Sequence, residues 1–162
     1  MNIRMEIRGT AAVVQFLDQF GTKVGLGAVR LINRAGLAIQ RDARRAAPVD
    51  TGYLRNRIVL NFSKGGLVAD VLADTPYARD VEDGTGTAAG HGPFRAMPPS
   101  SALADWARRH GMPGAGFVIA RAIYRRGGTK PRPFLTPAFE RHSADLFYKL
   151  NQLIKRTAGV GA

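Results

Sequence analysis

The sequence predicts an α+β fold, in which a small antiparallel sheet packs against a long N-terminal helix and a C-terminal helix. Three observations predict it: a helical apolar stripe over 28–47, strand-like runs on both sides of a short turn at 63–66, and a second helical stripe over 136–156. The chain has 162 residues, of which 45% are hydrophobic, so it is long enough for one compact core. We therefore expect a single domain over 1–162, with a flexible loop and helical insertion at about 84–133.

The N-terminal part carries a strand pattern followed by a long helical one. In residues 1–8, methionine and isoleucine alternate with polar or charged residues, which predicts a half-buried strand. The helical pattern begins near residue 11, and glycines over 21–27 predict a break or kink in it. From 28 to 47 the helix is strongly indicated, and Pro48 ends it because proline lacks a backbone N–H. The arginines expected on the solvent side of this helix are Arg30, Arg34, Arg41 and Arg45.

Three strand-like runs follow this helix. Leu54–Phe62 and Leu67–Ala73 read as two strands, and Ser63–Gly66 between them predicts a hairpin. A third run, Tyr77–Val81, comes after a Thr–Pro break. Because the connections are short, we expect a three-strand antiparallel meander, joined by the strand at 1–8.

The rest of the chain alternates between loops and helices. Segment 84–99 is rich in glycine, alanine and proline, so we expect a long mobile loop or an arm that orders on a partner. Ser100 or Ser101 is expected to cap a short helix, a second short helix is expected over 115–125, and 127–133 is another extended loop. The final helix, Thr136–Arg156, is expected to direct these residues inward: Phe139, Leu146, Leu150, Leu153 and Ile154.

The charge balance is strongly basic. Lysine and arginine outnumber aspartate and glutamate by 24 to 12, so the formal net charge is +12. Such a chain is attracted to polyanions, which include nucleic acid, an anionic membrane surface and an acidic protein face. A basic interface shared with acidic neighbouring subunits explains the composition equally well. Cysteine is absent, which excludes disulfides and cysteine-based zinc sites. No run approaches the roughly 18 apolar residues of a membrane-spanning helix, so we expect no membrane partner and a soluble cytoplasmic protein.

Neither the histidines nor the glycine-rich segment carries a recognisable binding motif. His91, His110 and His142 lack the spacing of a metal pair. Segment 84–90 superficially resembles a phosphate-binding loop, but Ala89 stands where the dinucleotide-binding pattern requires glycine. We therefore predict no metal-ligating or cofactor-binding residue, and no cofactor.

One acidic cluster, formed by Asp80, Glu82 and Asp83, is the only candidate for catalysis. Paired carboxylates perform acid–base chemistry or hold a divalent cation. No histidine or lysine lies nearby in the sequence, and pairing with arginine of another subunit explains the cluster better. A metal-dependent enzyme is the last of our hypotheses, and we predict no catalytic residue.

A basic cluster precedes the final helix, in a stretch without acids between residues 111 and 139. It neutralises phosphates of DNA, or it meets an acidic neighbouring subunit. We favour the neighbour, because no helix-turn-helix or finger motif accompanies the cluster. Trp106, the single tryptophan, either packs in a core or anchors a subunit interface. The cluster comprises Arg121, Arg125, Arg126, Lys130 and Arg132.

Three separated motifs resemble one known family. They are Ala-Pro-Val-Asp-Thr-Gly-Tyr-Leu-Arg at 47–55, Tyr-Ala followed by Val-Glu and Gly-Thr within 77–85, and Arg-Pro-Phe-Leu-Thr-Pro-Ala at 132–138. Together they resemble the tail-component proteins of long-tailed bacteriophages, also called neck or tail-completion proteins, and are similar in kind to the minor tail protein Z of phage lambda. Segments 103–106 and 120–131 resemble the insertion of the longer family members.

The resemblance implies a structural virion protein without catalysis, located in the neck or tail and assembled in the host cytoplasm. Its members form rings around the DNA channel, so the expected partners are other copies in a cyclic homo-oligomer, with a hexamer favoured. Connector, terminator or tail-tube proteins are expected to adjoin the ring, with packaged DNA contacted without sequence specificity. The interface or loop candidates are Asp50, Thr51, Gly52, Tyr77, Glu82, Gly84, Thr85, Trp106, Pro133 and Phe134.

The alternative from another class is a free basic nucleic-acid-binding protein, which contacts phosphates without reading bases. This alternative predicts that the purified chain binds DNA with a steep salt dependence. The structural hypothesis predicts instead that the chain is a component of purified virions.

Overall fold

The longest element of the fold is one helix, α1. The computed structural model describes residues 10–94 and 96–159. Helix α1 (Thr10–Ala46) is uninterrupted, so the predicted break at 21–27 is wrong. A Cβ on Gly27 would lie 2.6 Å from Cδ2 of Leu153, so this glycine brings two helices close together and does not end α1. The strand predicted for residues 1–8 lies outside the described residues.

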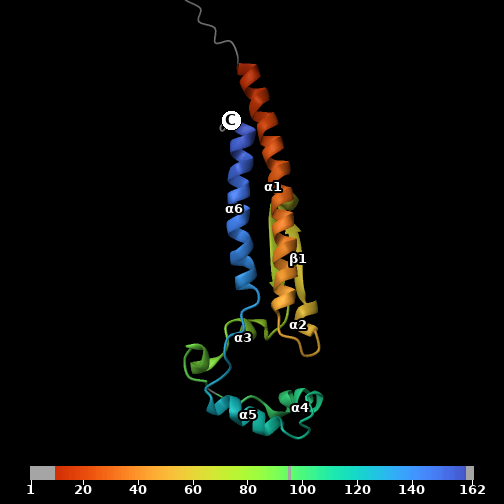
Figure 1. Cartoon of the computed structure of the whole chain (residues 1–162), viewed down its shortest axis with the longest axis vertical. Helices are drawn as coiled ribbons and strands as arrows, with labels where there is room; N and C mark the ends of the chain where they lie inside the picture. Colours follow the sequence, from red (N-terminus) through yellow and green to blue (C-terminus); the bar gives the residue numbers. More distant parts are fainter. Residues whose placement is uncertain (1–9, 95, 160–162) are drawn as a thin grey trace, which may run out of the picture.

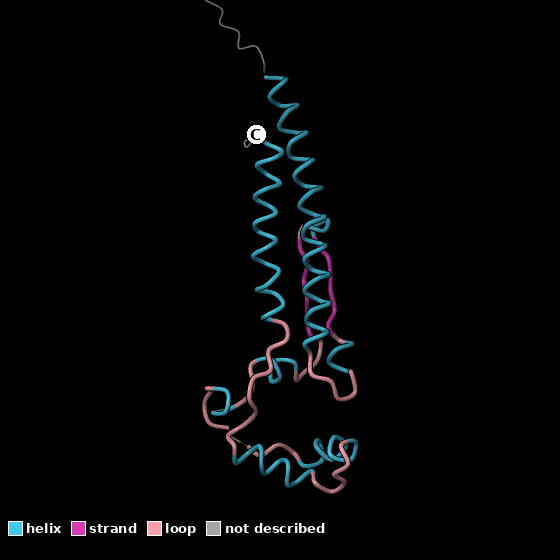
Figure 2. Tube along the Cα trace, in the orientation of Figure 1, coloured by secondary structure: helices cyan, strands magenta, loops and turns pink. Residues whose placement is uncertain are grey.

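Helix α1 lies between a second helix and a sheet. Helix α6 (Thr136–Ala158) runs along one side of α1, and the hairpin of β1 (Ile58–Ser63) and β2 (Val68–Ala73) packs against another side (Figure 1). The tube view shows that the N-terminal end of α1 continues past the end of α6 and past the hairpin (Figure 2). The predicted α+β class, with its two long helices, is therefore confirmed.

Over residues 10–94 and 96–159 the sheet has two strands, where a three-strand meander was predicted. Strand β1 pairs antiparallel with β2, with Leu60 opposite Val71, and the short 3-10 helix η1 (Lys64–Gly66) makes the predicted turn. The predicted third strand is wrong, because its residues begin helix α3 (Ala78–Glu82). The start of the predicted strand Leu54–Phe62 is also helical, in α2 (Tyr53–Asn56). Runs this short do not distinguish the two-residue repeat of a strand from the 3.6-residue repeat of a helix. Tertiary packing therefore decides which of the two forms.

The insertion forms a pair of helices at one end of the molecule. Helix α4 (Ser100–Arg109) packs against α5 (Gly116–Arg125), below the α1–α6 body in Figure 1. Before them, the described residues of segment 84–99 include the 3-10 helix η2 (Gly86–Ala89). Pro99 occupies the N-cap of α4 and no side chain caps it, so the predicted serine cap is wrong. The mobility of 84–99 stays a prediction.

The core lies where α1, α2, β1, α3 and the start of α6 meet. Its largest fully buried side chains are Phe134 and Ile58. On α6, Leu146, Leu150 and Leu153 are half-buried as predicted. Phe139 and Ile154 are 57% and 45% exposed, so their predicted inward orientation is wrong. The other members of the core are Ile39, Ala43, Ala47, Leu54, Ala78 and Ala138.

Candidate functional site

The three sequence motifs meet in this core. Ala47 and Leu54 come from the first motif, Ala78 from the second, and Phe134 and Ala138 from the third, and all of them are buried in one cluster. Phe134 is only 1% exposed, so its ring packs inside the core of the subunit. Its predicted role at an interface or loop stays a prediction.

Glu82 fixes the start of α6. Its Oε2 accepts the backbone N–H groups of Phe134 at 2.8 Å and Leu135 at 3.0 Å, and its Oε1 accepts that of Thr136 at 2.8 Å. The first N–H groups of a helix lack partners within the helix, and a carboxylate there also complements the helix dipole. The second motif thus provides the cap of the third motif's helix.

The ionisation of Glu82 follows from these bonds. Burial raises the pKa of its carboxyl, but the hydrogen bonds from Leu135, Phe134 and Thr136 stabilise the charged form, and the net result is a pKa below the usual value. A carboxylate with three fixed donors is not available as a base or metal ligand. Glu82 is a structural residue of the subunit.

The other two acids of the cluster point elsewhere. Asp80 is exposed on α3, and Asp83 forms an ion pair of 3.4 Å with Arg79 on the same helix. Within the described part of the chain, no group of three histidine or acidic side chains is arranged to hold a metal ion. Asp80, Glu82 and Asp83 therefore do not converge on one site.

The turn after α1 is tied to the insertion. Both guanidinium Nε and Nη2 of Arg109, at the end of α4, donate to the carboxylate of Asp50. The hydrogen bond to Arg109 lowers the pKa of Asp50. Gly52 adopts the left-handed conformation with φ 80° before α2, and the Thr51 hydroxyl accepts the N–H of Tyr53 at 3.4 Å. Asp50 thus ties the turn after α1 to α4 of the insertion.

Gly84 and Thr85 join the two loops that flank the insertion. Gly84 is buried with φ 71°, and a Cβ there would lie 2.6 Å from the carbonyl oxygen of Thr129. The N–H of Thr85 donates to that carbonyl at 2.9 Å, and the N–H of Thr129 donates to the Thr85 hydroxyl at 3.0 Å. The Gly-Thr motif therefore closes the base of the insertion within the subunit.

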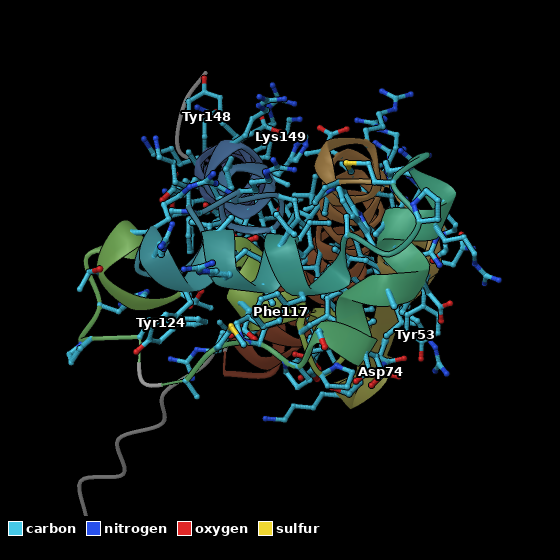
Figure 3. The ribbon with its side chains drawn as sticks, turned by 90° about the horizontal axis from the view of Figure 1, so that it is seen from below. Tyr53, Asp74, Phe117, Tyr124, Tyr148 and Lys149 are labelled. Carbon is cyan, nitrogen blue, oxygen red and sulfur yellow. The ribbon has the colours of Figure 1, made fainter. Side chains whose placement is uncertain are left out.

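The remaining predicted interface residues are accessible. Tyr77 is 41% exposed, with its ring 6.5 Å from that of Tyr53, and Pro133 is exposed. Trp106 is half-buried and stacks on His110 with ring centroids 4.0 Å apart. Figure 3 views this end of the molecule, where Phe117 and Tyr124 extend from α5. These two side chains are 55% and 46% exposed, and they add an apolar surface that the sequence did not single out.

The histidines make local or interhelical hydrogen bonds. His91 and His110 lie 3.2 and 2.9 Å from the carbonyl oxygens of Asp83 and Trp106. His142 on α6 lies 2.8 Å from Oδ2 of Asp42 on α1. Hydrogen bonds from Arg41 and His142 lower the pKa of Asp42 to about 2, so this carboxylate stays charged and links the two long helices.

The predicted basic cluster lies on α5 and the loop that follows it. Arg121 and Arg125 are one turn apart on α5, and all five side chains of the cluster are exposed. No ion pair within the described residues neutralises any of them. The cluster is therefore accessible to an acidic partner or to phosphates.

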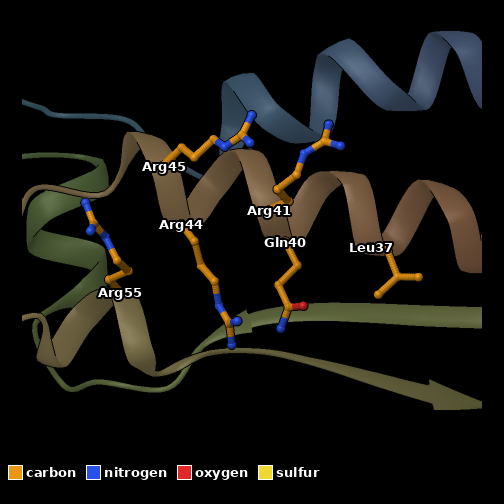
Figure 4. A pocket seen from close by; sticks show the side chains of 6 residues that line it. All are labelled: Leu37, Gln40, Arg41, Arg44, Arg45 and Arg55. Carbon is orange, nitrogen blue, oxygen red and sulfur yellow. The ribbon is translucent and has the colours of Figure 1, made fainter.

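A second basic surface was missed by the sequence analysis. An open pocket of about 520 Å³ is lined by Leu37, Gln40 and four arginines, and Figure 4 shows the arginines extending from α1 and α2. Arg44 is fixed by hydrogen bonds of 3.1 and 2.8 Å from its Nε and Nη2 to the carbonyl of Ile58. The pattern on α1 predicted exposed arginines, but only the turn through α2 brings Arg55 beside them. The four are Arg41, Arg44, Arg45 and Arg55.

One known protein family resembles part of the chain. The family described as "Bacteriophage HK97-gp10, putative tail-component" matches residues 11–84. The resemblance to phage tail components is thus confirmed over 11–84. The matched segment contains α1, the hairpin, α3 and the capping residue Glu82, while the third motif at 132–138 lies outside it. No curated protein matches the chain, and no solved structure matches it. No helix in the described part is long and apolar enough to cross a membrane.

Proposed function

We propose that this chain is a structural protein of the virion, located at the head–tail junction or at the head-proximal end of the tail. The tail-component match over 11–84 is the observation that carries the proposal. The match indicates a structural tail protein. The hydrogen bonds of Glu82 to the start of α6 hold the subunit together, and they agree with a structural role.

The assembly that we propose is a closed ring around the DNA channel. Large apolar side chains are exposed along both long helices and on the hairpin, and a structural subunit buries such side chains against its neighbours. A ring in which each copy meets a different surface of the next satisfies them without an open end. A hexamer is the copy number that we favour. Examples of these exposed side chains are Phe16, Leu17, Leu72, Phe139, Phe147 and Tyr148.

Partners follow from the position of the ring. Connector, terminator or tail-tube proteins of the same phage are the proposed neighbours above and below it. The basic cluster of α5 and the arginine pocket of α1 are the surfaces proposed to face acidic neighbours or DNA phosphates. Assembly takes place in the host cytoplasm, and the final location is the virion.

The proposal is tested by the composition of purified phage particles. We expect the chain to be present in a small, fixed number of copies per virion by quantitative mass spectrometry. Electron microscopy with a labelled chain is expected to show the label at the neck. Absence of the chain from purified particles would contradict the proposal.

A free nucleic-acid-binding protein is the second candidate, because two arginine-rich surfaces remain accessible. It predicts retention of the purified chain on DNA at low salt, lost steeply as salt increases. Reversing the charge of Arg121, Arg125 and Arg126 should then abolish retention on DNA. A chain with reversed charge at Arg45 and Arg55, in the other arginine-rich surface, is the comparison variant. Absence of retention at low salt would end this alternative.

A further inference from the structure

A groove lies between β2 and the start of α6. One of its sides is the edge of β2 that faces away from β1. The groove measures about 360 Å³, and its lining includes the apolar residues Ile39, Leu135 and Phe139 together with the strand itself. Ile39 is almost fully buried at the floor, while Phe139 is 57% exposed at the rim. The groove therefore offers apolar contacts beside the backbone of β2.

The edge of β2 that borders the groove has unpaired backbone groups. Among the described residues the sheet consists of β1 and β2, so each strand pairs on one side. Asp74 donates its N–H to Arg57, towards β1. Because direction alternates along a strand, the backbone groups of Ala69 and Val71 point away from β1. Among the described residues these groups make no hydrogen bond to another element.

The opposite edge of the sheet is already in use. The carbonyl of Ile58, which points outward from β1, accepts hydrogen bonds from Gln40 at 3.0 Å and from Arg44 at 2.8 Å. An added strand would have to displace both side chains there. The edge of β2 is therefore the better position for a further strand.

The chain contains one segment with the pattern that this edge requires. In residues 1–8, Met1, Ile3, Met5 and Ile7 alternate with polar or charged residues. Suppose that apolar residues of this segment pair opposite Ala69 and Val71. Their side chains then lie on the same face of the sheet as those of Ala69 and Val71, which is the face of the apolar groove. The residues between them then fall on the outer face beside Asp70, and Arg4 complements its charge.

The segment cannot reach the groove of its own chain. The nearest edge residue, Ala69, lies beside Gly36 of α1. The helix rises about 1.5 Å per residue, so Gly36 is about 39 Å from Thr10. Residues 1–9 span at most about 32 Å when fully extended. If residues 2–8 occupy this groove, they therefore come from a second copy.

We propose that residues 2–8 of one copy add as a strand to the edge of β2 in a second copy, with their apolar side chains in the groove beside Ile39 and Phe139. This interface depends on the self-association proposed above. It does not depend on the proposed location of the protein in the virion. It also assigns a role to the end of α1 that extends beyond α6, which carries the segment away from its own body and towards a neighbour.

Disulfide crosslinking tests the interface directly, because the chain has no cysteine of its own. An Asp70→Cys chain is mixed with a longer, tagged chain carrying Arg4→Cys, or Glu6→Cys for the neighbouring register. We expect a disulfide between the two chains of different size. A disulfide requires Cα atoms about 4.4–6.8 Å apart, a distance typical of paired strands.

Asn61→Cys provides the matched control. Asn61 is the partner of Asp70 on β1, so it lies on the same face but one strand farther from the added segment. It should give little product. A double variant with Arg4→Cys and Asp70→Cys in one chain should crosslink only between chains, and Ile3→Lys with Met5→Lys should remove the crosslink.

Light scattering of the same mixtures separates the two proposals. Equal crosslinking by Asp70→Cys and Asn61→Cys, or a disulfide within one chain, would overturn the added strand. An oligomer without the crosslink would overturn it and leave the proposed ring intact. A chain that is monomeric at every concentration would also overturn it, whereas virion composition tests the proposed function independently.

Discussion

Glu82 accepts a hydrogen bond of 2.8 Å from the backbone N–H of Phe134, across a sequence separation of 52 residues. The bond joins the matched tail-component segment to the C-terminal helix, which lies outside the match. Phe134 is buried against the same elements that carry Glu82. Glu82 therefore connects α3 to the start of α6, two elements that are far apart in the sequence.

Replacing Glu82 by glutamine should destabilise the fold. Glutamine keeps one acceptor oxygen and loses the charge, so the three backbone N–H groups at the start of α6 are no longer all satisfied. Hydrogen bonds to charged groups contribute about 1.5–3 kcal/mol, and we expect a loss of about 2 kcal/mol in the free energy of unfolding, measured by urea denaturation. Asp80→Asn, on the exposed side of the same helix, should change it by less than about 0.5 kcal/mol. Equal effects of the two variants would contradict the capping role.

Acid should weaken the fold through Asp42 and Glu82. Both have a pKa below the ordinary value, about 2 for Asp42, so the folded state binds these protons less readily than the unfolded state. Their contribution is complete above pH about 4.5 and is lost as the pH falls through the lowered values. We expect the thermal midpoint of the natural chain to fall between pH 4.5 and 2, and that of the Asp42→Asn, Glu82→Gln chain to fall less. Parallel pH profiles would contradict this explanation.

Truncation of Phe134 should be far more costly than truncation of an exposed aromatic residue. Phe134 is 1% exposed in the core, and removal of a buried phenyl ring costs roughly 3–5 kcal/mol. We expect Phe134→Ala to approach unfolding at room temperature by circular dichroism. Phe117→Ala, at a residue that is 55% exposed on α5, serves as the control and should keep the natural thermal midpoint. A tolerant Phe134→Ala chain would argue against the sealed core.

The tether between Asp50 and Arg109 should control the motion of the insertion and leave the stability of the body unchanged. Arg109→Gln releases α4 from the turn after α1, so hydrogen exchange over 100–125 should become faster while the thermal midpoint stays constant. Arg108→Gln is the matched control, because Arg108 pairs with Asp105 inside α4. Similar exchange in both variants would show that the tether does not hold the insertion.

Local patterns predicted the two long helices and the hairpin well. Pro48 and the apolar stripe before it located the end of α1, and the Gly-rich turn located the junction of β1 and β2. Tyr77–Val81 failed because five residues fit either a strand or a helix, and the contact of Ala78 with the core together with the cap made by Glu82 selects the helix.

The candidate site is built by contacts between residues that are far apart in the sequence. No local sequence pattern contains such contacts. Glycine suggested a helix break at Gly27, yet its function is the close approach of Leu153 from the far end of the chain. Asp50 and Arg109 are 59 residues apart, and Arg55 reaches the arginines of α1 only through the turn into α2. These long-range contacts can be identified only when the fold brings the three motifs together in one core.

An averaged cryo-electron microscopy reconstruction of the virion neck would test the proposed ring. We expect a ring of identical subunits around the DNA channel, in which each subunit shows α1 paired with α6 and Glu82 at the start of α6. A neck reconstruction at side-chain resolution in which no ring fits this subunit, from particles that lack the chain by mass spectrometry, would contradict it.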